Sequence, residues 1–183
     1  CYDQVESEED FYQSALSFGN FQCLLSDYPA ETLHETIPGF HYTKQRFANF
    51  KRAVEADVMG RTKAVEREIE FVLARERDAA VLGNLLAAGD LPLRVTHNYT
   101  KLNNIMIYDA TRQGICVIDL DTVMPGLSVN DFGDSIRFGA STAAEDEIDL
   151  GKVSCSMRLF EVYNNGLQKG CRGRLTDTEI EML

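Results

Sequence analysis

The sequence predicts an α+β fold that is mostly helical and carries one small β-hairpin. Apolar residues recur at helical spacing over residues 7–28, 44–57 and 61–89, and again after residue 129. Between these regions lie two short apolar runs, NIMIY and GICVIDL, which are joined by the polar turn DATRQG. Two such runs with a turn between them indicate a hairpin, and their apolar character predicts that its strands are buried.

We expect residues 1–183 to form a single partial domain. Its parts are a helical region over 1–89, a loop and hairpin region over 90–128 and a second helical region over 129–183. The length suffices for one domain with a sizeable core. Because the chain begins with a cysteine and stops soon after a helix start signal, we expect the whole domain to be larger.

The helices have recognisable start and stop signals. Pro29 ends the first one, and the segment 61–89 is expected to run as one long helix as far as Gly89. Near the end of the chain, Thr176 and Glu179 have the spacing of a capping box, which predicts that another helix begins there.

Composition excludes several classes of function. The net charge is −11, so a nucleic acid is not expected as a partner, because an acidic surface repels phosphate backbones. No apolar run is long enough to span a bilayer. The five cysteines are odd in number and form no C-x-x-C pair, which argues against a disulfide framework or a zinc site. Reduced thiols in the cytoplasm fit better.

Four polar residues flank the predicted hairpin: His97, Asn104, Asp119 and Asp121. Asn104 comes at the start of one strand, and the two aspartates come at the end of the other. Those two ends are adjacent in an antiparallel pair, so an amide and one or two carboxylates meet there. Mg²⁺ prefers such oxygen ligands, and nucleotide phosphates fill its remaining positions. The spacing is that of a kinase catalytic loop, H-x-D-x-x-x-x-N, followed by a metal-binding aspartate.

The stretch RVTHNYTKLNNIMIYDATRQGICVIDLDTVMPGLSVNDFGDSIRFGA resembles the aminoglycoside phosphotransferase and choline kinase superfamily, and within it most the N-acetylhexosamine 1-kinases. The resemblance implies the C-terminal lobe of a protein-kinase-like fold, with the N-terminal lobe expected upstream. It implies ATP-dependent phosphorylation of a sugar at its anomeric hydroxyl, with a nucleotide and a sugar as partners. Asn104 and Asp119 would then hold Mg²⁺, His97 would support the loop, and Asp121 would contact the metal or its surroundings.

Position 99 departs from that pattern. The family has its catalytic aspartate there, whereas this chain has Tyr99. A phenol with an ordinary pKa near 10 is a poor proton acceptor at neutral pH. A positioned base contributes roughly 10²–10⁴ in rate, so we expect at least that loss of activity in this chain.

Other polar residues have two interpretations each. Lys101 either reaches a phosphate or is a solvated lysine. His34 and His41 flank the loop ETIPGF, as sugar contacts or as surface histidines. Arg137 either forms a salt bridge or binds substrate. The sequence DFG at 131–133 opens a helical segment, so it is not the metal motif. Its acids Asp131 and Asp134 either favour the helix N-terminus or hold the catalytic loop.

Two other functions remain open at this stage. CVIDLDTV also fits the nucleophile motif of haloacid-dehalogenase-like phosphatases, with Asp119 attacking phosphate and Asp121 as general acid–base. Against it, about 118 residues precede that motif and only about 60 follow, too few for the parallel sheet such an enzyme needs. The second alternative is a non-catalytic pseudokinase lobe that keeps its sugar contacts.

Overall fold

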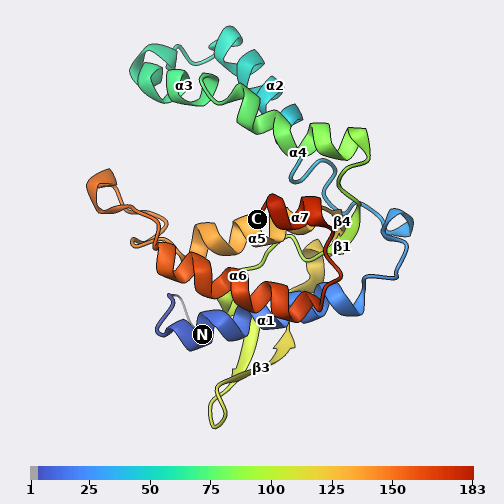
Figure 1. The fold of residues 1–183 in the computed structure, drawn as a ribbon. Helices are drawn as coiled ribbons and strands as arrows, with labels where there is room; N and C mark the ends of the chain where they lie inside the picture. The colour runs from blue at the N-terminus through green and yellow to red at the C-terminus, as the bar shows by residue number, and fades with distance from the viewer. Residues whose placement is uncertain (1–3) are drawn as a thin grey trace. The chain divides into compact units, whose positions relative to one another are not determined.

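The computed structural model describes residues 4–183, which form two compact units (Figure 1). The larger unit combines the residues up to Thr36 with Leu93–Leu183, and the smaller unit is Ile37–Pro92. The division therefore runs through the helical region expected over residues 1–89. Among the described residues no helix is both long and apolar enough to cross a membrane. The described cysteines are free thiols, and Cys1 lies outside the described residues.

The larger unit contains four α-helices and four short strands among its described residues. In chain order its elements are α1 (Glu8–Leu24), η1 (Ala30–Thr32), β1 (Arg94–Thr96), η3 (Leu102–Asn104), β2 (Ile105–Tyr108), β3 (Gln113–Val117), η4 (Leu120–Thr122), β4 (Met124–Gly126), α5 (Ser128–Gly139), η5 (Leu150–Lys152), α6 (Met157–Cys171) and α7 (Asp177–Glu181), where η marks a short 3₁₀-helix. The predominance of helix over small antiparallel sheets confirms the α+β class.

The core of this unit lies between α1 and α6, which run side by side (Figure 1). The helices approach closely because glycines face each other: a Cβ at Gly19 would collide with the carbonyl oxygen of Leu167. Beside this contact the ring centroids of Phe11 and Tyr163 lie 4.7 Å apart, and Phe132 of α5 packs against Tyr163. The aromatic stripe on α1 is therefore core packing, as its spacing indicates.

Both sheets are two-stranded and antiparallel. β1 pairs with β4, and β2 pairs with β3 with Ile105 opposite Val117. The core reaches only one face of the β2–β3 hairpin, through Ile105 and the partly buried Ile107 and Val117. The opposite face is open, with Met106 50% exposed. The prediction that these strands are buried is therefore wrong for one face of the hairpin, because α1 covers only the other.

The smaller unit consists of α2 (Thr43–Ala56), η2 (Thr62–Val65), α3 (Glu66–Leu73) and α4 (Glu76–Ala88). The prediction of one continuous helix over 61–89 is wrong, because the helix is interrupted between α3 and α4. At the break the Arg75 side chain donates to the Phe71 carbonyl at 2.7 Å, while the Arg75 backbone N–H bonds instead to Val72. The side chain thus takes the acceptor that a continuing helix would use. Gly89 does end α4, in the left-handed conformation with φ +82°.

The last helix begins as the sequence predicts. The Thr176 side chain accepts the backbone N–H of Glu179, and the Glu179 carboxylate accepts the backbone N–H of Thr176, which completes a capping box. The same carboxylate reaches across the unit to Arg94 at the start of β1. The C-terminal helix is thereby tied to the strand that leads into the candidate site.

Candidate active site

The buried carboxylate of Asp131 fixes the backbone of the loop between β1 and β2, residues 97–104. Asp131 on α5 accepts the backbone N–H groups of His97 at 3.0 Å and Asn98 at 2.7 Å, and the side-chain amide of Gln22 at 3.1 Å. Burial raises the pKa of this carboxyl, although the donated hydrogen bonds act in the opposite direction. Of the two roles open for Asp131, the structure supports the one that holds the loop 97–104.

A second set of hydrogen bonds, made by Asn98 and Thr122, fixes the start of the loop. Asn98 has φ +64°, in the left-handed region that asparagine tolerates better than most residues. Its side-chain amide donates to the carbonyls of Thr96 and Thr122, at 3.2 and 2.9 Å. The Thr122 hydroxyl in turn donates to the His97 carbonyl at 2.8 Å. The loop and the segment after β3 therefore form one hydrogen-bonded unit.

His97 supports this arrangement from a fully buried position. Its Nε2 lies 2.9 Å from the Ile118 carbonyl, and because that oxygen only accepts, Nε2 must carry the hydrogen. The rings of Phe18 and Phe21 stand edge-on to the imidazole, and Nδ1 has no hydrogen-bond partner in the described chain. The contact with Ile118 ties the loop to the residue that directly precedes Asp119. A supporting role is thus the one that its contacts fit.

At the open end of the hairpin, Asn104 contacts Ile118, the residue directly before Asp119. The backbone N–H of Ile118 donates to the Asn104 carbonyl at 2.9 Å, so the two chain segments touch at this point. The Asn104 side-chain N–H donates to the Tyr99 carbonyl at 2.7 Å, which leaves its amide oxygen available as a ligand. Asp119 is exposed, with φ +62°. One amide oxygen and one exposed carboxylate are a donor set that suits Mg²⁺.

Asp121 follows Asp119 by two residues, whereas the two loop histidines lie far from this pair in the sequence. Asp121 is exposed on η4, and its backbone carbonyl lies 3.4 Å from the Thr36 hydroxyl. His34 is exposed two residues before Thr36 in the larger unit. His41 belongs to the smaller unit, where its ring centroid lies 4.5 Å from that of Phe40.

Tyr99 is 38% exposed, between the buried residues Asn98 and Thr100. The ammonium nitrogen of Lys101 lies 5.1 Å from the centre of its ring and 3.1 Å from a carboxylate oxygen of Glu145. Lys101 is therefore paired rather than freely solvated. Arg137 also forms salt bridges, with Asp134 and with Glu145, as the simpler of its two interpretations expects.

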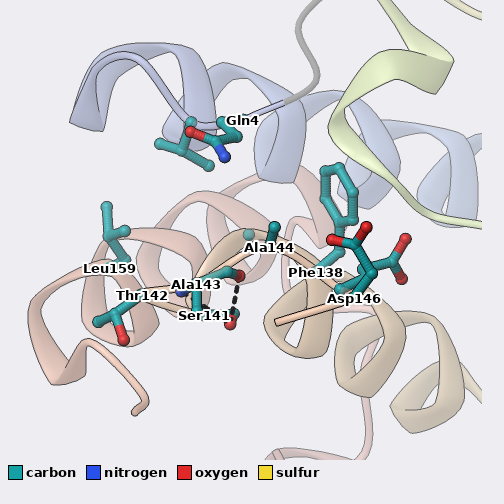
Figure 2. Close-up of a pocket in the computed structure, with 11 residues that line it drawn as sticks. Gln4, Phe138, Ser141, Thr142, Ala143, Ala144, Asp146 and Leu159 are labelled. Carbon is teal, nitrogen blue, oxygen red and sulfur yellow. Dashed lines mark hydrogen bonds between the residues drawn. The ribbon is translucent and has the colours of Figure 1, made fainter. Parts of the chain in front are cut away.

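Sequence reasoning missed several residues that hold the site, among them Glu145, Gln22 and Thr122. Glu145 belongs to the segment after α5 and is one of the residues that line a pocket of about 640 Å³ (Figure 2). The hydroxyl of Ser141, which also lines that pocket, donates to the carbonyl of Ala143 at 2.9 Å. Nothing local in the sequence marks these residues, because each acts on a partner more than twenty positions away or on a loop of irregular backbone.

Comparison with known families agrees with this geometry. The sequence profile of the phosphotransferase enzyme family matches residues 4–154. The chain belongs to this family. The match covers the first helix, the whole of the smaller unit, the loop 97–104, the hairpin and α5. Membership in this family makes phosphoryl transfer the general class of reaction.

The phosphatase alternative loses its structural basis in the same geometry. In the described chain, the strand before Asp119 pairs with β2 in an antiparallel hairpin. A haloacid-dehalogenase-like site needs that strand inside a parallel sheet built from βαβ units. The membership in the phosphotransferase enzyme family and the hairpin therefore point the same way.

Proposed function

We propose that the chain is the catalytic part of an ATP-dependent sugar kinase of the N-acetylhexosamine 1-kinase type. The single observation that carries the proposal is the contact of Asn104 with Ile118, the residue before Asp119, at the end of the hairpin and next to the ordered loop that bears residue 99. The phosphotransferase family membership makes kinase-type transfer the general reaction. The sugar specificity rests on the resemblance of the loop and hairpin segments to that class of kinase.

In this proposal Asn104 and Asp119 hold Mg²⁺, with Asp121 as a further candidate ligand. The ion, when bound, neutralises the negative charge of the nucleotide phosphates. The residues of the chain supply position: His97 and Asp131 keep the loop rigid, so that residue 99 and the metal ligands hold a constant separation. Lys101 is the candidate phosphate contact of the loop.

The open face of the hairpin supports nucleotide binding. Met106 and Cys116 are cross-strand partners on that face, and Ile118 follows on the same side, directly before Asp119. Met106 and Ile118 are 50% and 38% exposed. An apolar surface that ends at a metal-binding carboxylate suits a nucleotide, whose base is flat and apolar and whose phosphates bind the metal.

Tyr99 impairs the reaction in this proposal. The family's carboxylate would accept the proton of the sugar hydroxyl and orient that oxygen for in-line attack. A phenol at neutral pH is protonated and cannot accept it in the same way. The expected loss is roughly 10²–10⁴ in rate, or about 3–5 kcal/mol of transition-state stabilisation.

Three further residues are candidate substrate contacts in this proposal. His34 and His41 flank the loop that the resemblance assigns to sugar binding. Arg137 is the weakest of the three, because its guanidinium already contacts Asp134 at 2.9 Å and Glu145 at 2.5 Å. Alanine at His34 or His41 should raise the KM for sugar, whereas alanine at Arg137 should act mainly on stability.

A second candidate is a non-catalytic sugar-binding lobe, and one observation favours it. The ring of Tyr99 is engaged with the Lys101 ammonium, so the base position is filled by a side chain that already has a stabilising contact. Calorimetric titration of the protein with Mg²⁺-ATP and with N-acetylglucosamine separates the two. Binding of sugar without any turnover, also after Tyr99→Asp, supports the non-catalytic lobe.

The kinase proposal is tested by phosphoryl transfer from ATP to N-acetylhexosamines. The assay compares the parent protein with Tyr99→Asp and Asp119→Ala, each made also in the whole gene product. We expect Tyr99→Asp to raise the rate and Asp119→Ala to abolish it in either background. If neither parent nor Tyr99→Asp transfers phosphate to any hexosamine, the sugar kinase assignment is wrong.

A further inference from the structure

A ring of hydrogen bonds and salt bridges joins the loop 97–104 to the segment after α5. The backbone N–H of Thr100 donates to one oxygen of Asp134 at 3.0 Å, and Arg137 binds the other oxygen at 2.9 Å. Arg137 then reaches Glu145 at 2.5 Å, and Glu145 accepts from Lys101 at 3.1 Å. The ring starts and ends on neighbouring residues of the same loop, so it fixes the direction of the Lys101 side chain as well as the loop backbone.

Two aromatic rings complete the surroundings of the Lys101 ammonium. Its nitrogen lies 5.1 Å from the ring centre of Tyr99 and 5.3 Å from that of Phe138. Both distances are within the range of a cation–π contact. The side chain of Lys101 is 15% exposed, against 49% for Glu145. The lysine is therefore held in one place by three groups, of which only Glu145 carries a full negative charge.

Within this ring, Lys101 and Glu145 each stabilise the charged form of the other. Burial lowers the pKa of Lys101, but its hydrogen bonds to Glu145 and Tyr99 outweigh that effect, and the net pKa is raised. The hydrogen bonds from Arg137 and Lys101 lower the pKa of the Glu145 carboxyl. Arg137 thus keeps Glu145 ionised, and ionised Glu145 is the partner that Lys101 needs.

Resting on the proposed function, we propose that Glu145 is a positioning residue that fixes the Lys101 ammonium beside residue 99. Lys101 is the only cationic side chain in the sequence of the loop 97–104. In this proposal the Lys101 ammonium, two residues from the base position, stabilises the negative charge of the transferred phosphoryl group. Glu145 itself touches no reacting atom and acts through the lysine.

The placement is tested directly by NMR of the lysine ammonium groups, with Lys101→Arg to assign the signal. We compare the parent protein with Glu145→Gln, which keeps the size of the side chain and removes its charge. The matched control is Glu147→Gln in the same segment, because Glu147 pairs with Lys152 at 3.7 Å instead. We expect hydrogen exchange of the Lys101 ammonium to be roughly three- to tenfold faster in Glu145→Gln alone, as for a charged hydrogen bond at a half-exposed partner. An unchanged Lys101 signal in Glu145→Gln overturns the inference.

The consequence for the reaction is measured in the Tyr99→Asp background, where turnover is expected. Glu145→Gln should lower kcat by about three- to tenfold and leave the KM for sugar within about twofold, because it disturbs a group that acts on the phosphoryl group. If hydrogen exchange of the Lys101 ammonium is faster in Glu145→Gln but kcat is unchanged or rises, Glu145 has only a structural role and the positioning role is wrong. If Tyr99→Asp transfers no phosphate at all, the proposed function fails, and the NMR comparison still decides whether Glu145 places Lys101.

Discussion

Replacement of Glu179 by alanine should destabilise the larger unit strongly. The Glu179 side chain is 1% exposed, and its carboxylate accepts four hydrogen bonds. Two come from Arg94 at 2.6 Å each, one from the Ser128 hydroxyl at 2.6 Å and one from the backbone N–H of Thr176 at 2.8 Å. Glu179→Ala removes the acceptor for all four and leaves the guanidinium, whose side chain is 14% exposed, without its ion-pair partner.

The expected cost is about 3–5 kcal/mol, the range for removing one partner of a buried ion pair. With a urea m-value of roughly 2 kcal/mol/M, the unfolding midpoint should fall by about 1.5–2.5 M. Far-UV circular dichroism during urea titration measures the change. Glu181→Ala is the matched control, because Glu181 is exposed on the same helix and should change stability by no more than about 0.5 kcal/mol.

A double variant separates the ion pair from simple packing. Arg94→Met combined with Glu179→Leu removes both charges and keeps most of the volume, so it should be less destabilised than Glu179→Ala alone. A loss below about 1 kcal/mol for Glu179→Ala would refute the reasoning. So would a double variant that is less stable than the single one, because no unpaired buried charge would then explain the loss.

Three further predictions concern pH, the catalytic loop and the core. Burial raises the pKa of Glu179, but its hydrogen bonds to Arg94, Ser128 and Thr176 outweigh that effect, and the net pKa is lowered. The stabilisation by ionised Glu179 is therefore complete above its ordinary pKa and disappears as the pH falls below it. The difference in stability between the parent and Glu179→Ala should shrink in urea titrations from about pH 5 to pH 3. Asp131→Asn replaces one acceptor oxygen by a donor, so the amide protons of the loop residues that it holds should exchange at least about tenfold faster by NMR, and unchanged exchange would contradict its role. Gly139→Ala should cost about 1–3 kcal/mol in thermal unfolding, because its Cβ would collide with Phe11, whereas Gly133→Ala on the same helix meets open space and should stabilise by up to about 1 kcal/mol.

Local sequence signals predicted the parts of the fold that depend on neighbours in the chain. The hairpin, the stop at Gly89 and the capping box at Thr176 each rest on residues within a few positions of one another. The meeting of Asn104 with the segment before Asp119 also follows from the hairpin alone, since antiparallel strands bring their opposite ends together. These features needed no knowledge of tertiary packing.

Features set by distant contacts could not be predicted in this way. A continuous apolar run does not reveal which face of a strand a helix will cover, so the exposure of Met106 was missed. The break before α4 depends on the Arg75 side chain, which competes for a carbonyl, and residues 66–82 around it contain no glycine or proline. Asp131 remained ambiguous because the amides that it binds lie 33 and 34 positions earlier in the chain.

We propose that this chain has the scaffold and metal ligands of a kinase but lacks its base. The most direct measurement is the rate of ATP-dependent phosphorylation of N-acetylglucosamine by the parent protein and by Tyr99→Asp, under identical Mg²⁺ and in the whole gene product. The account predicts a rate increase of roughly 10²–10⁴ for Tyr99→Asp, and loss of that gain when Asp119 is replaced by alanine. Equal rates for the parent and Tyr99→Asp would contradict it.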